Sequence, residues 1–284
     1  MEKKDRAIVF CATSDMTFAI ASVMMDLRRY CPNIADEIVI FHDGIGSKDQ
    51  RLLNEILPTR FLRYVFPFHD SRIFHQGTLN YFSKMVYSKF ECFGLLKEYK
   101  KVLYTDYDIV IREDISELFD DEENLDLIIS NDNKVRDQFF DDIEGYDMGI
   151  PGISTALIYL RDTLPGADKY RDWCYERTRL LANRLRFPEQ GIFDLLLQEF
   201  NLRIRGIDHD AYCSHPILSP KAATAKILHA WGRKKFWNGL DNKQWNTNYL
   251  EWLRMGGKKY KRKPNWPLSV RIKRKILKTL NMEN

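Results

Sequence analysis

Short apolar runs alternate with segments of helical spacing in the N-terminal part of the chain, and this alternation restricts the fold more than any other feature. Residues 7–12, 37–41 and 61–65 are short and apolar, which predicts three strands. Residues 18–29 carry apolar side chains at helical spacing, and Ser47 is the expected N-cap of a helix through Leu57. This order predicts an α/β protein with parallel strands, right-handed crossovers and a ligand site beyond the carboxyl ends of the strands.

A pair of aspartates follows the next predicted strand. Apolar residues 102–104 precede Asp106 and Asp108, and residues 109–111 continue as another apolar run. Extended backbone turns residues i and i+2 to the same side, so the two carboxylates face one way and Tyr107 the other. Such carboxylates repel each other unless a cation lies between them, and oxygen ligands suit Mg²⁺ or Mn²⁺. The alternative is a polar turn that only ends a strand.

The sequence lacks the glycine-rich motifs of two large nucleotide-binding classes. It contains neither G-x-G-x-x-G nor G-x-x-x-x-G-K-[ST], so a dehydrogenase-type dinucleotide site and a P-loop are both unsupported. The missing glycine-rich triphosphate loop also argues against a nucleotidyltransferase, which could otherwise use paired aspartates.

Composition is that of an ordinary globular protein. The chain has 284 residues, of which 44% are apolar and 30% charged, and no apolar run approaches the roughly 20 residues of a membrane-spanning helix. The N-terminus enters a strand-like run directly and lacks a signal-peptide pattern. The five scattered cysteines form no C-x-x-C pair and are odd in number, which predicts reduced, mostly buried thiols in a cytoplasmic protein.

Positive charge gathers at the C-terminus. Residues 254–284 contain eleven Lys or Arg and one acid, whereas the whole chain has a net charge of only +4. We expect residues 258–280, which include a basic amphipathic segment and Trp266, to meet an anionic membrane surface. A tail that folds back on the acidic body is the main alternative. Nucleic acid is not expected as a partner, because no base-stacking platform accompanies these charges.

The aspartate pair lies in a segment that resembles glycosyltransferase family 8. Residues 100–110 read KKVLYTDYDIV and residues 114–119 read DISELF, similar to the D-x-D segment of that family. The resemblance implies an α/β fold of the GT-A (Rossmann-like) type, with a mixed sheet flanked by helices. It also implies a Mn²⁺ or Mg²⁺ ion, a UDP-sugar donor, and retaining transfer of a hexose to an acceptor hydroxyl of a glycan, lipid-linked saccharide or glycoprotein.

Further segments resemble the family's donor-binding motifs. By this resemblance the loop after the first strand binds the nucleotide through Cys11, Ala12, Thr13 and Asp15, and Lys89 stands where the family has an arginine that reaches the donor. Asp106, Tyr107 and Asp108 would contact the nucleotide and its cation. In the strand at residues 152–160, Ser154 or Thr155 would touch the donor sugar. A polar strand-to-helix turn and a solvated helix lysine are the alternatives for the loop and for Lys89.

Two later motifs complete the series. Residues 187–194 resemble [YF]-x-D-Q-D-x-[LF]-N, which assigns Glu189 and Gln190 a place near the anomeric carbon. The alternative is a helix start in which the acid complements the dipole. Residues 229–237 resemble H-x-x-G-x-x-K-P-W, which implies His229 as a third metal ligand and Gly232 and Lys235 as contacts of the diphosphate. A structural histidine is the alternative there.

These motifs span residues 7–237, which suggests a division of the chain. We expect a catalytic domain at residues 1–240 and a helical, basic extension at residues 241–284, with the protein in the cytoplasm or peripheral on the inner face of the membrane. The departures from the family pattern at Met16, Lys89, Glu189 and Phe236 leave a second possibility, a non-catalytic nucleotide-sugar-binding protein on the same fold.

Overall fold

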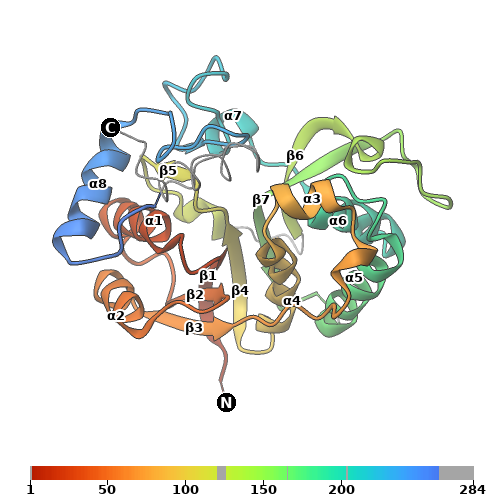
Figure 1. Ribbon diagram of the computed structural model, residues 1–284, viewed down its shortest axis with the longest axis horizontal. Coiled ribbons are helices and arrows are strands. Elements are labelled where there is room, and N and C mark those ends of the chain that lie inside the picture. Colours follow the sequence, from red (N-terminus) through yellow and green to blue (C-terminus); the bar gives the residue numbers. More distant parts are fainter. Residues whose placement is uncertain (1, 120–125, 165, 203, 262–284) are drawn as a thin grey trace, which may run out of the picture.

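A computed structural model of the chain describes residues 2–119, 126–164, 166–202 and 204–261 (Figure 1). The basic amphipathic helix expected near the C-terminus lies outside the described residues. None of the helices within those ranges has the length and apolar character needed to cross a membrane.

A seven-stranded sheet forms the centre of the molecule, with strand order β3-β2-β1-β4-β7-β6-β8. Its strands are β1 (Lys4–Ala12), β2 (Glu37–His42), β3 (Thr59–Arg63), β4 (Tyr99–Thr105), β6 (Asp126–Lys134), β7 (Pro151–Arg161) and β8 (Ile204–Arg205). β3, β2, β1 and β4 pair in parallel, as the sequence predicts, whereas β7 is antiparallel to both β4 and β6. The α/β class with a mixed sheet flanked by helices is therefore confirmed.

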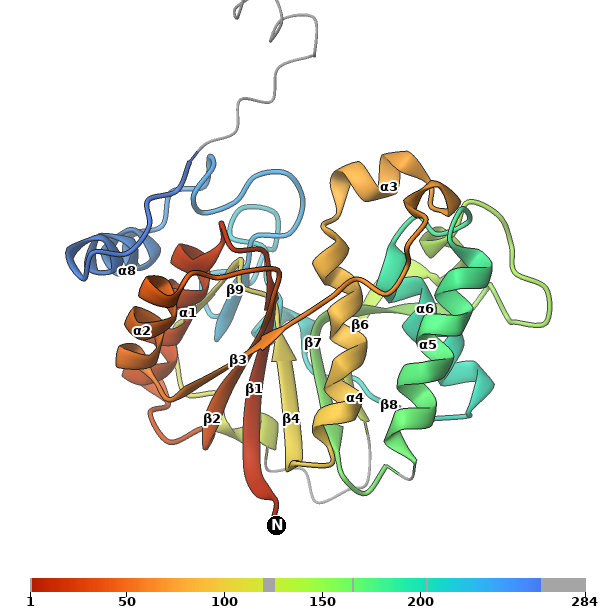
Figure 2. The same cartoon turned by 60° about the horizontal axis from the view of Figure 1, so that its bottom comes forward.

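Helices cover both faces of this sheet. α1 (Thr17–Tyr30), α2 (Ser47–Ile56) and α8 (Lys243–Arg254) lie on one side, and α4 (Glu91–Leu95), α5 (Ala167–Leu181) and α6 (Pro188–Glu199) lie on the other (Figure 2). β1 is buried on both faces: Ile8 and Phe10 join the core under α1, while Ala7 and Val9 join the core under α4 and α6. This two-sided burial explains why the strand reads as a continuous apolar run.

One local expectation is wrong in detail. Ser47 is the first residue of α2 and not its N-cap, because the carbonyl of Gly46 already accepts the first helical hydrogen bond from Gln50 N at 3.0 Å. Several short helical pieces connect β3 to β4. α3 (Gln76–Tyr81) is followed by a 3₁₀ helix, η2 (Lys84–Phe90), which leads directly into α4.

Shorter elements complete the description. Three further 3₁₀ turns are η1 (Ser71–Ile73), η3 (Ser116–Phe119) and η4 (Val135–Gln138), and α7 (His209–Tyr212) is a single helical turn.

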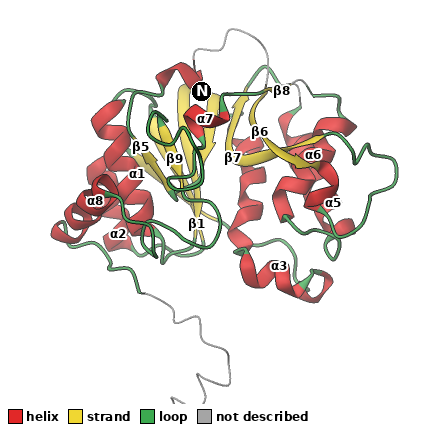
Figure 3. Ribbon diagram, turned by 90° about the horizontal axis from the view of Figure 1, so that it is seen from above, coloured by secondary structure: helices red, strands yellow, loops and turns green. Residues whose placement is uncertain are grey.

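A second, two-stranded sheet lies beside the main one, on the side of α1 and α8 (Figure 3). It pairs β5 (Ile109–Ile111) antiparallel with β9 (Ile227–His229), so that Ile109 stands opposite His229. The fully buried carboxylate of Asp26 in α1 accepts from Ile111 N at 3.2 Å and from Asn248 Nδ2 in α8 at 2.6 Å. This carboxylate ties β5, α1 and α8 together, and burial raises its pKa to about 6. The domain boundary expected at residue 240 stays a prediction.

Candidate functional site

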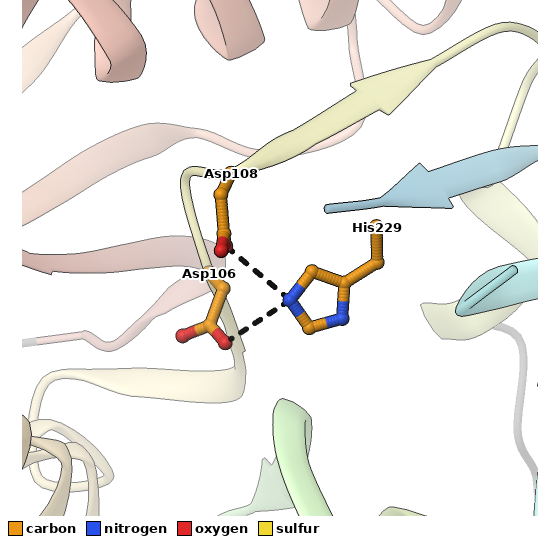
Figure 4. A group of neighbouring side chains, drawn as sticks. All are labelled: Asp106, Asp108 and His229. Carbon is orange, nitrogen blue, oxygen red and sulfur yellow. Dashed lines mark ion pairs between the residues drawn. The ribbon is translucent and has the colours of Figure 1, made fainter. Parts of the chain in front are cut away.

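Asp106, Asp108 and His229 converge at the carboxyl end of β4 (Figure 4). The two aspartates lie in the turn between β4 and β5, and His229 ends β9. His229 Nε2 is 3.3 Å from Asp108 Oδ1 and 3.6 Å from Asp106 Oδ2. One ligand atom from each of the three residues lies within 4.8 Å of the others, so the group has the size and donor chemistry of a divalent-cation site.

Backbone pairing fixes this turn on both sides. Asp106 N donates to Ala156 O of β7 at 2.9 Å, and the carbonyl of Asp108 accepts from Ala230 N at 2.8 Å. His229 N donates in turn to Ser214 O at 2.9 Å. Backbone hydrogen bonds therefore hold the carboxylates and the imidazole in place. The tertiary structure brings His229 to two aspartates that lie more than 100 residues earlier in the chain.

Positive charge compensates the buried carboxylate of Asp108. Lys235 Nζ donates to Asp108 Oδ2 and, at 2.8 Å, to Ala230 O. Burial by itself would raise the pKa of Asp108, but the nearby charges of His229 and Lys235 outweigh that effect and hold the pKa below its ordinary value. Gly232 has φ = +80° in the turn that returns the chain to Lys235, a conformation that disfavours other residues even though the space around it is open.

Cys213 contacts His229 at the ring nitrogen that does not face the carboxylates. Its sulfur lies 3.1 Å from His229 Nδ1, and both side chains are buried. With Nδ1 engaged by the thiol, Nε2 is the nitrogen that faces the carboxylates. Burial would raise the pKa of Cys213, yet the charge of His229 and a bond to His209 bring it down to about 7. The sequence indicates only a buried thiol, and no spacing rule connects it with His229.

Lys89 is buried beside the aspartate turn, so the alternative of a solvated helix lysine is wrong. Only 4% of Lys89 is exposed, and its Nζ lies 2.8 Å from Glu189 Oε1 and 3.4 Å from Asp106 Oδ1. Thr155 Oγ1 also donates to Glu189 Oε1, at 2.9 Å. Burial would lower the pKa of Lys89, but the charges of Asp106 and Glu189 raise it above its usual value. Lys89 therefore links the aspartate turn to the start of α6.

Gln190 is held by a residue that the sequence does not single out. Its Nε2 donates to Gln138 Oε1 at 2.9 Å, and its Oε1 lies 3.4 Å from Thr155 N. Gln138 is fully buried and ends η4. Because it lies 52 residues before Gln190, only the tertiary structure reveals the contact.

The expected nucleotide loop lies at the carboxyl end of β1, on the same edge of the sheet as the aspartate turn. Thr13 Oγ1 donates to Asp15 Oδ1 at 2.6 Å, and both residues are half-buried. The side chains of Cys11 and Ala12 are buried in the cores on opposite faces of β1, so they are turned away from this edge. The binding roles expected for these four residues stay predictions.

Tyr107 and Ser154 also lie near the site without pointing at its carboxylates. Tyr107 stacks on Trp237, with ring centroids 6.3 Å apart. Ser154 Oγ accepts from Ala156 N at 3.3 Å. Thr155, the other candidate in this strand, is the one that contacts Lys89 and Glu189.

The buried lysine gives a stability prediction. Lys89→Met leaves the Glu189 carboxylate buried without its counter-charge, so we expect the free energy of unfolding to fall by about 3–5 kcal/mol in urea denaturation. The double variant Lys89→Met/Glu189→Leu should recover part of that loss, because it removes the uncompensated charge. The exposed Lys100→Met is the control and should change little. Equal stability of Lys89→Met and Lys100→Met would contradict this account.

Comparisons with known proteins agree with this geometry. Residues 7–142 match the family profile described as glycosyl transferase family 8, a range that includes the Asp106/Asp108 turn and Lys89. No curated protein matches the chain in sequence.

Three solved structures share the fold. The galactosyltransferase LgtC, solved with donor and acceptor sugar analogues, has a TM-score of 0.60 at 13% identity, over 92% of this chain and 98% of LgtC. The bifunctional glycosyltransferase WbbM has a TM-score of 0.59 at 15% identity, over 96% of this chain and 51% of WbbM. The glycosyltransferase GlyE of Streptococcus pneumoniae TIGR4 has a TM-score of 0.58 at 17% identity, over 89% of this chain and 64% of GlyE. The profile match over residues 7–142 and the shared GT-A fold therefore agree with the resemblance to glycosyltransferase family 8 and indicate a glycosyltransferase.

Proposed function

We propose that this glycosyltransferase moves a hexose from a UDP-sugar to an acceptor hydroxyl, with retention of the anomeric configuration and with a divalent cation, Mn²⁺ or Mg²⁺. The observation that carries the proposal is the convergence of Asp106, Asp108 and His229 beside two buried or half-buried lysines. A diphosphate is stabilised by positive charges around it, and Lys89 and Lys235 supply such charges at the carboxyl end of β4.

The residues present fit such a cation. Two carboxylates and an imidazole form a ligand set that suits Mn²⁺, and their ligand atoms already lie within 4.8 Å of one another. A second observation points to a polar ligand close by. Oε2 of Glu189 is buried and has no hydrogen-bond partner among the described residues, so it could accept from a hydroxyl of the donor sugar.

Held by Asp106, Asp108 and His229, the cation would stabilise negative charge on the leaving diphosphate. Lys235 would add a positive charge beside it, since its amine already contacts Asp108. The new bond joins the acceptor oxygen to the anomeric carbon, the bond from that carbon to the diphosphate oxygen breaks, and the leaving diphosphate takes the acceptor's proton. Attack from the leaving-group side retains the configuration.

Glu189 and Gln190 would have different tasks. Lys89 and Thr155 both bond to Oε1 of Glu189, which holds that carboxylate in place and compensates its charge. Gln138 accepts from the amide nitrogen of Gln190, while the amide oxygen, 3.4 Å from Thr155 N, keeps a second lone pair that can face the anomeric carbon. We therefore propose Gln190 as the contact of the reacting sugar and Glu189 as a contact of its hydroxyls.

Metal dependence tests the proposal directly. With Mn²⁺, we expect the wild type to release UDP from at least one of UDP-glucose, UDP-galactose and their N-acetyl forms. In EDTA, this release of UDP should stop. Asp108→Ala and His229→Ala should each lower this rate by about 100-fold or more, because they remove a ligand of the charge-stabilising cation. The exposed Glu55→Ala is the control. Full activity in EDTA, or donor binding by the wild type without turnover, would contradict the proposal.

The thiol behind His229 gives a second test, one that does not depend on activity. Cys213→Val removes the partner of Nδ1, so we expect Mn²⁺ affinity, measured by electron paramagnetic resonance titration, to fall by about tenfold. Cys213→Ser should lie closer to the wild type, since its hydroxyl can still bond to the ring. Cys31→Val, at another buried cysteine, is the matched control. Unchanged affinity in Cys213→Val would exclude a role in positioning His229.

For the chain as a whole we propose a catalytic domain at residues 1–240 and a basic extension that brings it to the cytoplasmic face of an anionic membrane. Support comes from the charge of residues 254–284, with eleven Lys or Arg and one acid.

Co-sedimentation with anionic vesicles at low salt should capture the full chain but not a chain ending at residue 261. Ending there keeps the contact of Tyr260 N with the Tyr249 hydroxyl on α8. Equal binding of both chains, or of neither, would contradict the membrane role.

A further inference from the structure

We propose that an aromatic cavity beside the start of α6 binds a saccharide ring of the acceptor. The cavity has a volume of about 290 Å³ and is lined mainly by the rings of Tyr81, Phe82, Phe140 and Phe187, with His75 and Arg186. That volume lies just below the roughly 300–1,000 Å³ found for sites of drug-sized molecules, which suits a small ligand such as one or two sugar rings. The inference rests on the proposed transfer of a sugar to an acceptor hydroxyl.

Three aromatic rings of this cavity are exposed, whereas rings that only stabilise the fold are usually buried. Tyr81 is 54% exposed, Phe140 40% and Phe187 37%, although each contacts another ring or cation of the cavity. Exposed apolar side chains are normal when they are scattered, but three around one hollow mark a ligand site. Aromatic faces with a few polar groups are the surface that a sugar ring, apolar on its faces and polar at its rim, can use.

The polar groups of the cavity are available for sugar hydroxyls. The guanidinium of Arg186 lies 5.4 Å from the centre of the Phe140 ring, and no hydrogen bond or ion pair of this side chain is found within the part of the chain that the structure describes. The His75 ring packs against Phe140 at a tilt of 51° with centroids 4.3 Å apart, and its Nδ1 accepts from Thr78 N at 3.3 Å. Arg186 can therefore donate several hydrogen bonds to a ligand resting on these rings.

The walls of the cavity are anchored to each other, so its shape is fixed before a ligand arrives. Thr78 Oγ1 of α3 donates to Leu185 O at 2.9 Å, and His75 N donates to Ala182 O at 3.3 Å. Gly77 keeps the place of the His75 ring free, because a Cβ at this position would come within 2.8 Å of Cε1 of that ring. A preformed site loses less entropy when it binds.

The position of the cavity identifies its occupant as the acceptor. The backbone of Gln138 accepts from Arg186 N and Phe187 N, at 2.9 and 3.1 Å, while its side chain holds Gln190. One buried residue thus joins the cavity to the amide proposed to face the anomeric carbon. The loop after β1 that is expected to bind the nucleotide contacts Asp43 instead, through Ser14 N at 2.6 Å, so a nucleotide base is the less suitable occupant of the cavity.

Saturation-transfer NMR on the full chain tests this assignment with four disaccharides: maltose, cellobiose, lactose and diacetylchitobiose. We expect at least one to bind in the absence of UDP, and Tyr81→Ala and Phe140→Ala each to weaken its dissociation constant by about threefold or more. Leu180→Ala, which removes an equally exposed apolar side chain from α5, is the matched control and should bind like the wild type. Thermal melting checks that each variant folds.

The outcomes separate this inference from the proposed function. No binding by any of the four, or equal binding by wild type, Tyr81→Ala and Phe140→Ala, would overturn the saccharide site. Loss of uridine binding in the same two variants, without loss of disaccharide binding, would make the cavity a base site and also overturn it. Titration of UDP with Mn²⁺ is run in parallel: its failure would count against the proposed donor, while the disaccharide result would still decide the cavity.

Discussion

The burial of several carboxylates close to one another is the constraint on which the rest of this site depends. Asp106 and Asp108 stand two residues apart in a turn where Asp108 is only 8% exposed, and Glu189, 5% exposed, lies near them. Three carboxylates cannot share such a place without cations. Lys89 bridges Glu189 and Asp106, and Lys235 and His229 flank Asp108. These cationic side chains are therefore what allows the carboxylates to stay together in a buried turn.

Two layers of the fold meet at this cluster. The parallel half of the sheet, β3-β2-β1-β4, ends in the loop after β1 and in the aspartate turn, whereas the antiparallel strand β7 supplies Thr155. The small β5–β9 sheet then delivers His229 to the turn from far along the chain. Each part is held by backbone pairing, which limits the freedom of the charged groups and so favours a preorganised site.

Two residues of the candidate site, His229 and Gln190, are each held by a buried side chain. Cys213 engages Nδ1 of His229, and Gln138 engages the amide of Gln190. Gln138 also accepts backbone hydrogen bonds at the rim of the aromatic cavity. The geometry of the amide and that of the cavity are therefore set by the same residue.

The sequence by itself determined the fold class and the ordered series of charged residues. Apolar runs of strand length and helical spacing are local signals, and the spacing of Asp106, Asp108, His229, Gly232 and Lys235 is recorded in two short segments. Only the tertiary structure decided that Lys89 is buried and that Cys213 and Gln138 support the site. It also decided that rings from residues 75–82, 140 and 187 surround one cavity. These features depend on contacts between distant segments, and such contacts leave no period or spacing in a single sequence.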